Sequence, residues 1–152
     1  MSDFAERVAV EDLAIRLFVA TDRRNWPAVE DCFTDPLILD MTSLAGGEPL
    51  TLKPADVSRA WAEGFRSLDH VHHQVGNFQT SITGDRARMH CYGIAFHHRA
   101  SIATTSRTRV FVGTYDLDCT RDQGRWRIGL LRFHLKFIEG NPELDESAQG
   151  PG

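Results

Sequence analysis

Hydrophobic residues recur at helical spacing in three segments of the first half of the chain. Between residues 4 and 22 they return every three to five positions and form a wide apolar stripe, which predicts a helix that lies on a sheet and ends at about Asp22. A second, short helix is predicted over residues 25–33, because its first residues, Asn-Trp-Pro, combine a helix cap with a proline that suits a first turn. The third helix begins at Pro54, and its apolar face carries Val57, Trp61 and Phe65.

Beyond this third helix the pattern changes to that of strands. Four long strands are predicted, at residues 71–82, 86–98, 107–120 and 125–139, with tight turns at Thr83-Gly84-Asp85 and Asp122-Gln123-Gly124. Two short strands precede the third helix, Leu37–Met41 and Leu50–Leu52, joined by a turn over Ala45–Pro49. Strands of about twelve residues are well above the usual five or six, which implies that they are strongly twisted and curved.

Helices followed by long antiparallel strands define the fold class as α+β. We expect the N-terminal helices to pack in the concave face of a long, curved, mainly antiparallel sheet. A single domain is predicted over residues 1–140, and residues 141–152 are predicted to form a loose C-terminal tail, because they are rich in Pro and Gly and poor in apolar residues. A helix layer cupped by a curved sheet leaves a conical cavity, which is a natural place for a ligand.

The composition limits the classes of partner that the protein is expected to bind. The net charge of −4 and the lack of a Lys/Arg cluster argue against nucleic acid, which selects a basic face. Cys32, Cys91 and Cys119 are odd in number and in no CxxC pair, so we expect buried, reduced thiols in a cytoplasmic protein. An acidic N-terminus without a basic, apolar leader predicts no signal peptide, and no apolar run is long enough to cross a membrane. The expected partner is a small molecule.

Histidines are concentrated between His70 and His98, which holds six of the seven. Imidazole titrates near neutral pH, so histidines on neighbouring strands, together with one carboxylate, would make a general acid/base site. Strand alternation sends His72 and His73 to opposite faces, and periodicity does not choose between them. On the next strand we take the face with small residues as the cavity lining; it carries Met89, Cys91, Gly93, Ala95 and His97.

Five short pieces of sequence resemble those of a known family. They are VEDLAIRLFVATDRRNW, HHQVGN, TGDRA, VGTY, and GRWRI followed by EGN, and together they span essentially the whole chain. On these pieces the chain resembles the SnoaL-like branch of the nuclear transport factor 2-like superfamily, and within it the scytalone dehydratase and hexachlorocyclohexane dehydrochlorinase group. The resemblance implies a cone-shaped α+β barrel and a homo-oligomer, either dimer or trimer.

The resemblance also implies a catalytic pair. Enzymes of that group work without cofactors, using an Asp from the first helix and a His from the third strand, and these positions match Asp22 and His73. A second catalytic His of the scytalone dehydratases matches His97. Two tyrosines of those dehydratases are replaced here by Thr21 and Met41, so their substrate is not carried over.

Two functions remain open from the sequence. The first is a cofactor-independent lyase or isomerase that acts on a small apolar or polycyclic molecule, with His73 as the base, Asp22 as its orienting partner and His97 as an acid or hydrogen-bond donor. The second is a non-catalytic module of the same fold that binds small molecules or serves in assembly. Further substrate-binding candidates are Phe18, Met41, Trp61 and Phe65 as a pocket wall, Asn77 for a substrate oxygen, and Arg132 for a substrate anion.

A metal site is the least favoured alternative. His70 and His72 lie on one strand face, and His97 or His134 could supply a third imidazole. No carboxylate stands at a ligand spacing from them, so no metal is expected. The resemblance implies that no other cofactor is used.

Overall fold

The structure, a computed structural model, describes residues 3–102 and 106–144. The elements in chain order are α1 (Asp3–Asp22), α2 (Trp26–Asp31), β1 (Phe33–Asp40), α3 (Thr42–Ala45), β2 (Leu50–Leu52), α4 (Pro54–Gly64), β3 (His70–Thr83), β4 (Arg86–His98), β5 (Thr108–Asp122) and β6 (Arg125–Gly140). The strands form one sheet in the order β2-β1-β6-β5-β4-β3. All neighbouring strands are antiparallel except β1 and β6, which are parallel.

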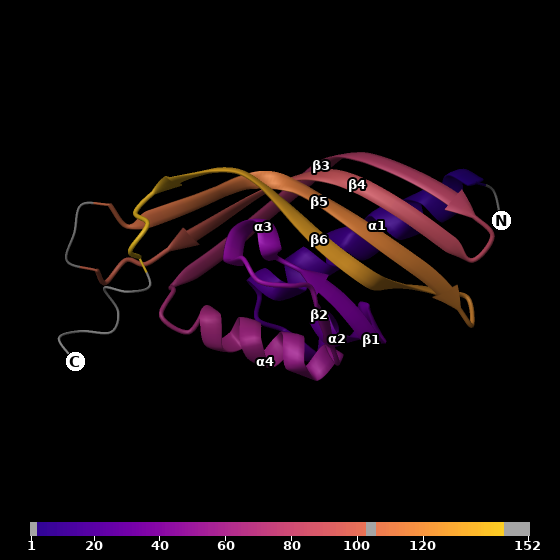
Figure 1. The fold of residues 1–152 in the computed structure, drawn as a ribbon, viewed down its shortest axis with the longest axis horizontal. Coiled ribbons are helices and arrows are strands. Elements are labelled where there is room, and N and C mark those ends of the chain that lie inside the picture. The colour runs from indigo at the N-terminus through magenta and orange to yellow at the C-terminus, as the bar shows by residue number, and fades with distance from the viewer. Residues whose placement is uncertain (1–2, 103–105, 145–152) are drawn as a thin grey trace.

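The four long strands arch over the helices (Figure 1). Helix α1 runs beneath the arch and contacts β3, β4 and β6, and α4 lies near the first helices and β1. This arrangement confirms the predicted α+β class with helices in the concave face of a curved sheet. Within residues 3–102 and 106–144, no helix is long and apolar enough to span a membrane.

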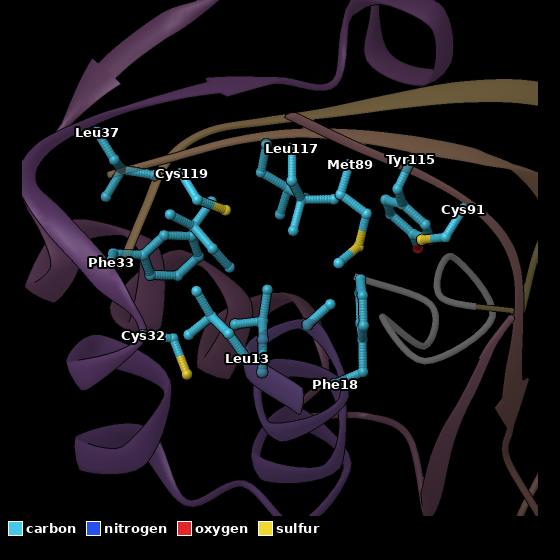
Figure 2. Packing of buried hydrophobic residues seen from close by; sticks show 14 of the residues in the cluster. Leu13, Phe18, Cys32, Phe33, Leu37, Met89, Cys91, Tyr115, Leu117 and Cys119 are labelled. Carbon is cyan, nitrogen blue, oxygen red and sulfur yellow. The ribbon is translucent and has the colours of Figure 1, made fainter. Parts of the chain in front are cut away.

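The core lies between α1 and the concave face of the sheet. Val10, Leu13 and Leu17 of α1 are almost completely buried, as the predicted stripe requires. Figure 2 shows Leu13 and Phe18 facing Met89, Leu117 and Tyr115, which come from the sheet. Burial of these apolar side chains is the main force that holds the helix against the strands.

The three cysteines are free thiols inside this core. Cys32, Cys91 and Cys119 are each at most 2% exposed, which confirms that they are buried and unpaired. Burial raises the pKa of the Cys91 and Cys119 thiols to about 12. Both thiols are therefore protonated at neutral pH and behave as small apolar side chains.

The first strand begins earlier than predicted. The short helix α2 ends at Asp31 rather than continuing through Phe33, and β1 starts at Phe33 rather than at Leu37. Phe33 is buried, pairs with Ile128 of β6 and contacts the ring of Trp61. Pairing with the sheet therefore prevails over the local helical pattern.

The link between β1 and β2 also differs from the predicted simple turn, because it contains a short helix. A single helical turn, α3, occupies Thr42–Ala45, and only then do Gly46 and Gly47 turn the chain with φ values of 72° and 74°. Those values lie in the left-handed region, which glycine enters without steric cost. The antiparallel pairing of β1 with β2 is as predicted, with Leu37 opposite Leu52.

The predicted C-terminal tail falls mostly on residues 145–152, outside the described residues. Of its first four residues, Leu144 is completely buried and packs with Leu68, Val71 and Ile102. This small cluster lies apart from the main core, so the chain stays packed for several residues beyond β6.

Candidate active site

A cavity of about 200 Å³ opens between the helices and the concave face of the sheet. Its walls are largely apolar, and two histidine rings lie among them. Six of the residues predicted for the site contribute to the lining: Phe18, Met41, Trp61, Phe65, His73 and His97. An apolar cavity into which a few polar groups converge is the usual form of a small-molecule site.

Asp22, the last residue of α1, holds His73 of β3 by two hydrogen bonds. The Asp22 Oδ2 accepts the backbone N–H of His73 at 2.8 Å, and Oδ1 lies 2.6 Å from the ring Nδ1. The side chains are 17% and 10% exposed, respectively. Because an ionised carboxylate can only accept, Nδ1 carries the hydrogen and Nε2 of the neutral ring has the lone pair. His73 is therefore held in the tautomer that can accept a proton at Nε2.

Phe18 completes the support of His73. It lies one helical turn before Asp22, so both side chains project from the same face of α1. Its ring stacks on the imidazole with a centroid distance of 5.1 Å. The imidazole is thus held at its edge by the carboxylate and on its face by an aromatic ring, which leaves it little rotational freedom.

His97 stands on β4, one strand away from His73. In the β3–β4 register, His73 lies opposite Ala95 and His97 lies opposite Val71, so the two rings belong to diagonal positions on one sheet face. The edge of Phe65 and the ring of Phe111 flank His97, with centroid distances of 5.4 and 4.9 Å. The Nη2 of Arg109 lies 3.2 Å from its Nδ1.

Two predicted substrate contacts do not reach this cavity. Asn77 is exposed, because a β-bulge between Gly76 and Gln79 places it at φ 53° and breaks the alternation that links it to His73. Arg132 is on the other face of β6 from the cavity-lining Leu131, and its Nε donates to Asp40 Oδ2 at 2.8 Å. Asn77 and Arg132 therefore lie outside the lining of this cavity, and their substrate-binding role stays a prediction.

Several lining residues were missed by the sequence predictions, above all Tyr115 and Phe111 of β5. Tyr115 lies opposite Cys91 in the β4–β5 register, so extending the inward face of β4 across that strand pair would have found it. Burial raises the pKa of the Tyr115 hydroxyl, with smaller contributions from Cys91 and Asp22. The phenol is therefore neutral at physiological pH and can donate a hydrogen bond but not act as a base.

Gly93 makes room for the Tyr115 ring. A Cβ at position 93 would lie 2.2 Å from Tyr115 Cε2, a distance that no real contact tolerates. The ring instead lies over the strand and packs between Phe18 and Phe133, with centroid distances of 4.8 and 4.9 Å. Nearby, the Thr21 hydroxyl donates to the Leu17 carbonyl, so it does not replace the missing phenol at that position.

The histidines considered for a metal site are dispersed. His70 stacks on His98, His72 lies against Phe96, and His134 bonds Asp116. In the part of the chain that the structure describes, no group of three or more His, Cys, Asp or Glu side chains could hold a metal ion.

A second hollow, of about 520 Å³, lies on the opposite face of the sheet. Although it is larger than the cavity, charged side chains such as Arg88, Asp118 and Arg132 line much of it. Its histidine–aspartate contact, between His90 and Asp116, is formed by side chains that are 39% and 38% exposed. Volume alone does not make a binding site, so the smaller, apolar cavity is the candidate.

Comparison with solved structures defines the fold class. A protein from Kribbella flavida, Kfla4162, superimposes with a TM-score of 0.88 at 22% identity, over 98% of this chain and 100% of that one. A protein from Novosphingobium aromaticivorans, provisionally assigned as a scytalone dehydratase, gives 0.79 at 11% identity, over 91% and 89%. A hexachlorocyclohexane dehydrochlorinase from Novosphingobium barchaimii gives 0.73 at 13% identity, over 91% and 92%. At these identities the likeness shows the fold alone, the cone-shaped fold of nuclear transport factor 2-like proteins.

Sequence comparison then gives the family. The family model of the SnoaL-like domain matches residues 2–132, and the chain belongs to this family. No curated protein matches the chain in sequence. The resemblance predicted from the five sequence pieces is thus confirmed at the level of family and fold.

Proposed function

We propose that this protein is a cofactor-independent lyase or isomerase that removes a proton from a carbon atom of a small apolar molecule. One observation carries the proposal: the 2.6 Å contact between Asp22 Oδ1 and His73 Nδ1 in the wall of an apolar cavity. A non-catalytic binding module has no need to hold the two side chains together. A carboxylate behind an imidazole fixes the tautomer and increases the basicity of the other ring nitrogen.

The mechanism follows from this tautomer. His73 Nε2 takes the proton from a C–H bond, and Asp22 stabilises the imidazolium that forms. The electron pair of that bond then forms a C=C bond as a leaving group departs with its own pair, which is a lyase reaction. Alternatively, the proton returns to a different carbon, which is an isomerisation. In this proposal His97, which also lines the cavity, donates a hydrogen bond to the group where negative charge develops.

The cavity volume limits the substrate. A void of about 150 Å³ is enough for benzene, so about 200 Å³ suits a molecule of one or two rings better than a larger polycycle. The names of the similar structures, a dehydratase and a dehydrochlorinase, belong to lyase activities and support this reaction class.

Proton transfer to and from carbon is the property to test. Indanone is a bicyclic ketone of suitable size, and we expect the protein to accelerate exchange of its α-protons for deuterium in D₂O, followed by NMR. Release of chloride from hexachlorocyclohexane tests the elimination branch. His73→Asn should abolish both reactions, whereas His72→Asn, an exposed neighbour on the other strand face, should retain them. Full activity of His73→Asn would contradict the proposal, and binding of indanone without any reaction would favour the non-catalytic module.

We also propose that the protein works as a cytoplasmic homo-oligomer. Ile94, Val112 and Phe137 are register partners across three strands, and together they form an apolar row on the face opposite the cavity. Tyr92 and Phe137 are each 48% exposed. Burial of such a row against a second copy would remove apolar area from water. Multi-angle light scattering should give a mass above that of the monomer, and Phe137→Glu should lower it.

A further inference from the structure

In the contact between Arg109 and His97, the chemistry of the two side chains decides which one donates the hydrogen bond. A guanidinium has five N–H donors and no acceptor, so at 3.2 Å from Nη2 the Nδ1 of His97 must be the acceptor. A hydrogen on Nδ1 would face the N–H of Arg109 and place two positive groups together if the ring were charged. The neutral ring therefore carries its hydrogen on Nε2.

We infer that Arg109 is a positioning residue, which holds His97 as the neutral Nε2–H tautomer so that it donates a hydrogen bond to a carbonyl-type oxygen of the ligand. The tautomer is argued from the contact between Arg109 Nη2 and His97 Nδ1. The nature of the ligand oxygen rests on the proposed function, because the oxygen is where negative charge collects when His73 removes a neighbouring proton.

The surroundings of His97 keep the ring in place for this role. Phe65 and Phe111 flank the imidazole on two sides, and the guanidinium of Arg109 lies over the ring of Phe111 at 4.9 Å from its centroid. The arginine is thus itself held by a cation–π contact. A ring fixed in this way donates along one direction, which is the geometric requirement for stabilising developing charge.

The two cavity histidines consequently have opposite tautomers. Asp22 accepts from Nδ1 of His73 and leaves a lone pair on its Nε2, whereas Arg109 donates to Nδ1 of His97 and leaves a hydrogen on its Nε2. One ring is a base and the other is a neutral donor. A neutral imidazole that polarises a carbonyl is established chemistry, and the pair suits proton removal beside a carbonyl better than it suits protonation of a leaving group by a charged His97.

The tautomer can be measured without any substrate. In protein labelled with ¹⁵N on its histidines, two-bond ¹H–¹⁵N correlation spectra at slightly alkaline pH distinguish a protonated ring nitrogen from an unprotonated one. Wild-type His97, assigned by loss of its signals in His97→Asn, should show an unprotonated Nδ1. In Arg109→Met the Nδ1 signal should move toward the position of a partly protonated nitrogen, and in Arg109→Lys it should stay near wild type, because an ammonium also only donates.

Two controls separate this effect from general damage. Arg107→Met removes a positive charge from an exposed neighbouring position and should leave His97 unchanged. His98, whose Nδ1 lies 2.9 Å from Thr108 Oγ1, serves as an internal reference for intact packing in every variant. A hydrogen on Nδ1 of wild-type His97, or an unchanged Nδ1 signal in a folded Arg109→Met, would overturn the inference.

The ligand part is tested by binding. Indanone and indane share a ring skeleton, and only indanone has the oxygen. Wild type should bind indanone about three- to tenfold more tightly than indane, as expected for one hydrogen bond, and His97→Phe should lose this preference. An equal affinity of wild type for the two compounds would overturn the ligand assignment, while loss of deuterium exchange in His73→Asn reports separately on the proposed function.

Discussion

Two histidine–aspartate arrangements occur on opposite faces of the same sheet, and only one of them has the properties of an active site. Inside the cavity, Asp22 holds His73 at 2.6 Å. On the outer face, Asp116 lies 2.7 Å from His90 and 2.8 Å from His134. The distances are almost the same, so hydrogen-bond geometry does not distinguish the two sites.

Burial and neighbours do distinguish them. The side chains of the outer cluster are 38–48% exposed, against 10% and 17% for the inner pair. Burial raises the pKa of Asp116, but the hydrogen bonds from His90 and His134 outweigh it and bring the pKa below its usual value. Water screens such exposed pairs, and they contribute little free energy. Only the inner pair has an apolar cavity in front of the imidazole.

The largest difference between the two faces should be in catalysis. Asp22→Asn leaves one acceptor oxygen for the two N–H groups of His73. An amide NH₂ that faces Nδ1 donates to it and favours the wrong tautomer, so we expect kcat/KM for the indanone exchange reaction to fall by about 10³- to 10⁴-fold. Asp116→Asn on the outer face is the matched control and should leave kcat/KM within about twofold of wild type. Equal losses in the two variants would remove the distinction between the faces.

The second difference is in packing. Leu13 is 1% exposed between α1 and the sheet, whereas Ile94 on the outer face is 36% exposed. Leu13→Ala should lower the free energy of unfolding by about 2–5 kcal/mol, because it leaves a cavity in the core. Ile94→Ala should cost less than about 1 kcal/mol, provided that both proteins are measured by urea unfolding as monomers.

A third carboxylate, Asp40, shows what hydrogen bonds do to a buried acid outside the cavity. Asp40 is buried and accepts hydrogen bonds from Thr42 and from Arg132, which lower its pKa from 3.8 to about 2. Because the pKa is lower in the folded state, the ionised carboxylate stabilises the fold at pH values above 3.8. This stabilisation is lost as the pH falls toward 2. Asp40→Asn should therefore lower the free energy of unfolding by about 1–3 kcal/mol at neutral pH.

The pH dependence supplies the check on Asp40. The difference between Asp40→Asn and wild type should shrink when the pH falls from about 4 to about 2, because the wild-type carboxyl becomes protonated in that window. Chemical unfolding at a series of pH values measures it. A difference that stays constant down to about pH 2 would show that the loss is steric rather than electrostatic.

The smallest effect is expected from the outer cluster itself. His90→Ala removes one of the two hydrogen bonds that lower the pKa of Asp116. Since both side chains are more than one-third exposed, the free energy of unfolding at neutral pH should change by less than about 1 kcal/mol. A larger change, seen only at high protein concentration, would indicate that this face is buried in the oligomer.

Much of the fold could be predicted because its signals are periodic. The apolar stripe of α1 and the long alternating strands place Asp22 at a helix end and His97 on the inward face of β4, next to the buried Ala95. Local exceptions to periodicity could not be predicted. The bulge that turns Asn77 outward depends on one residue in the left-handed region, and residue 33 joins the sheet because of a partner almost a hundred positions later.

The site itself needed contacts that are distant in sequence. Alternation treats His72 and His73 as equivalent. The family resemblance selects His73, and the physical reason is its contact with Asp22, across 51 positions. The same holds for Arg109, whose importance depends on lying beside His97 across the β4–β5 pair. The missing information is the packing of α1 against β3 in the first case and the β4–β5 register in the second.

The glycine beneath Tyr115 sets the capacity of the cavity. The ring of Tyr115 occupies the space that a β-carbon would take at position 93. It therefore lies as close to the β4 backbone, and as far out of the cavity, as the strand permits. Any side chain introduced at position 93 would lift the ring toward the ligand and shrink the cavity. Replacing Tyr115 with a smaller residue should therefore enlarge the cavity for larger substrates. Substitutions of Gly93 can only make the cavity smaller.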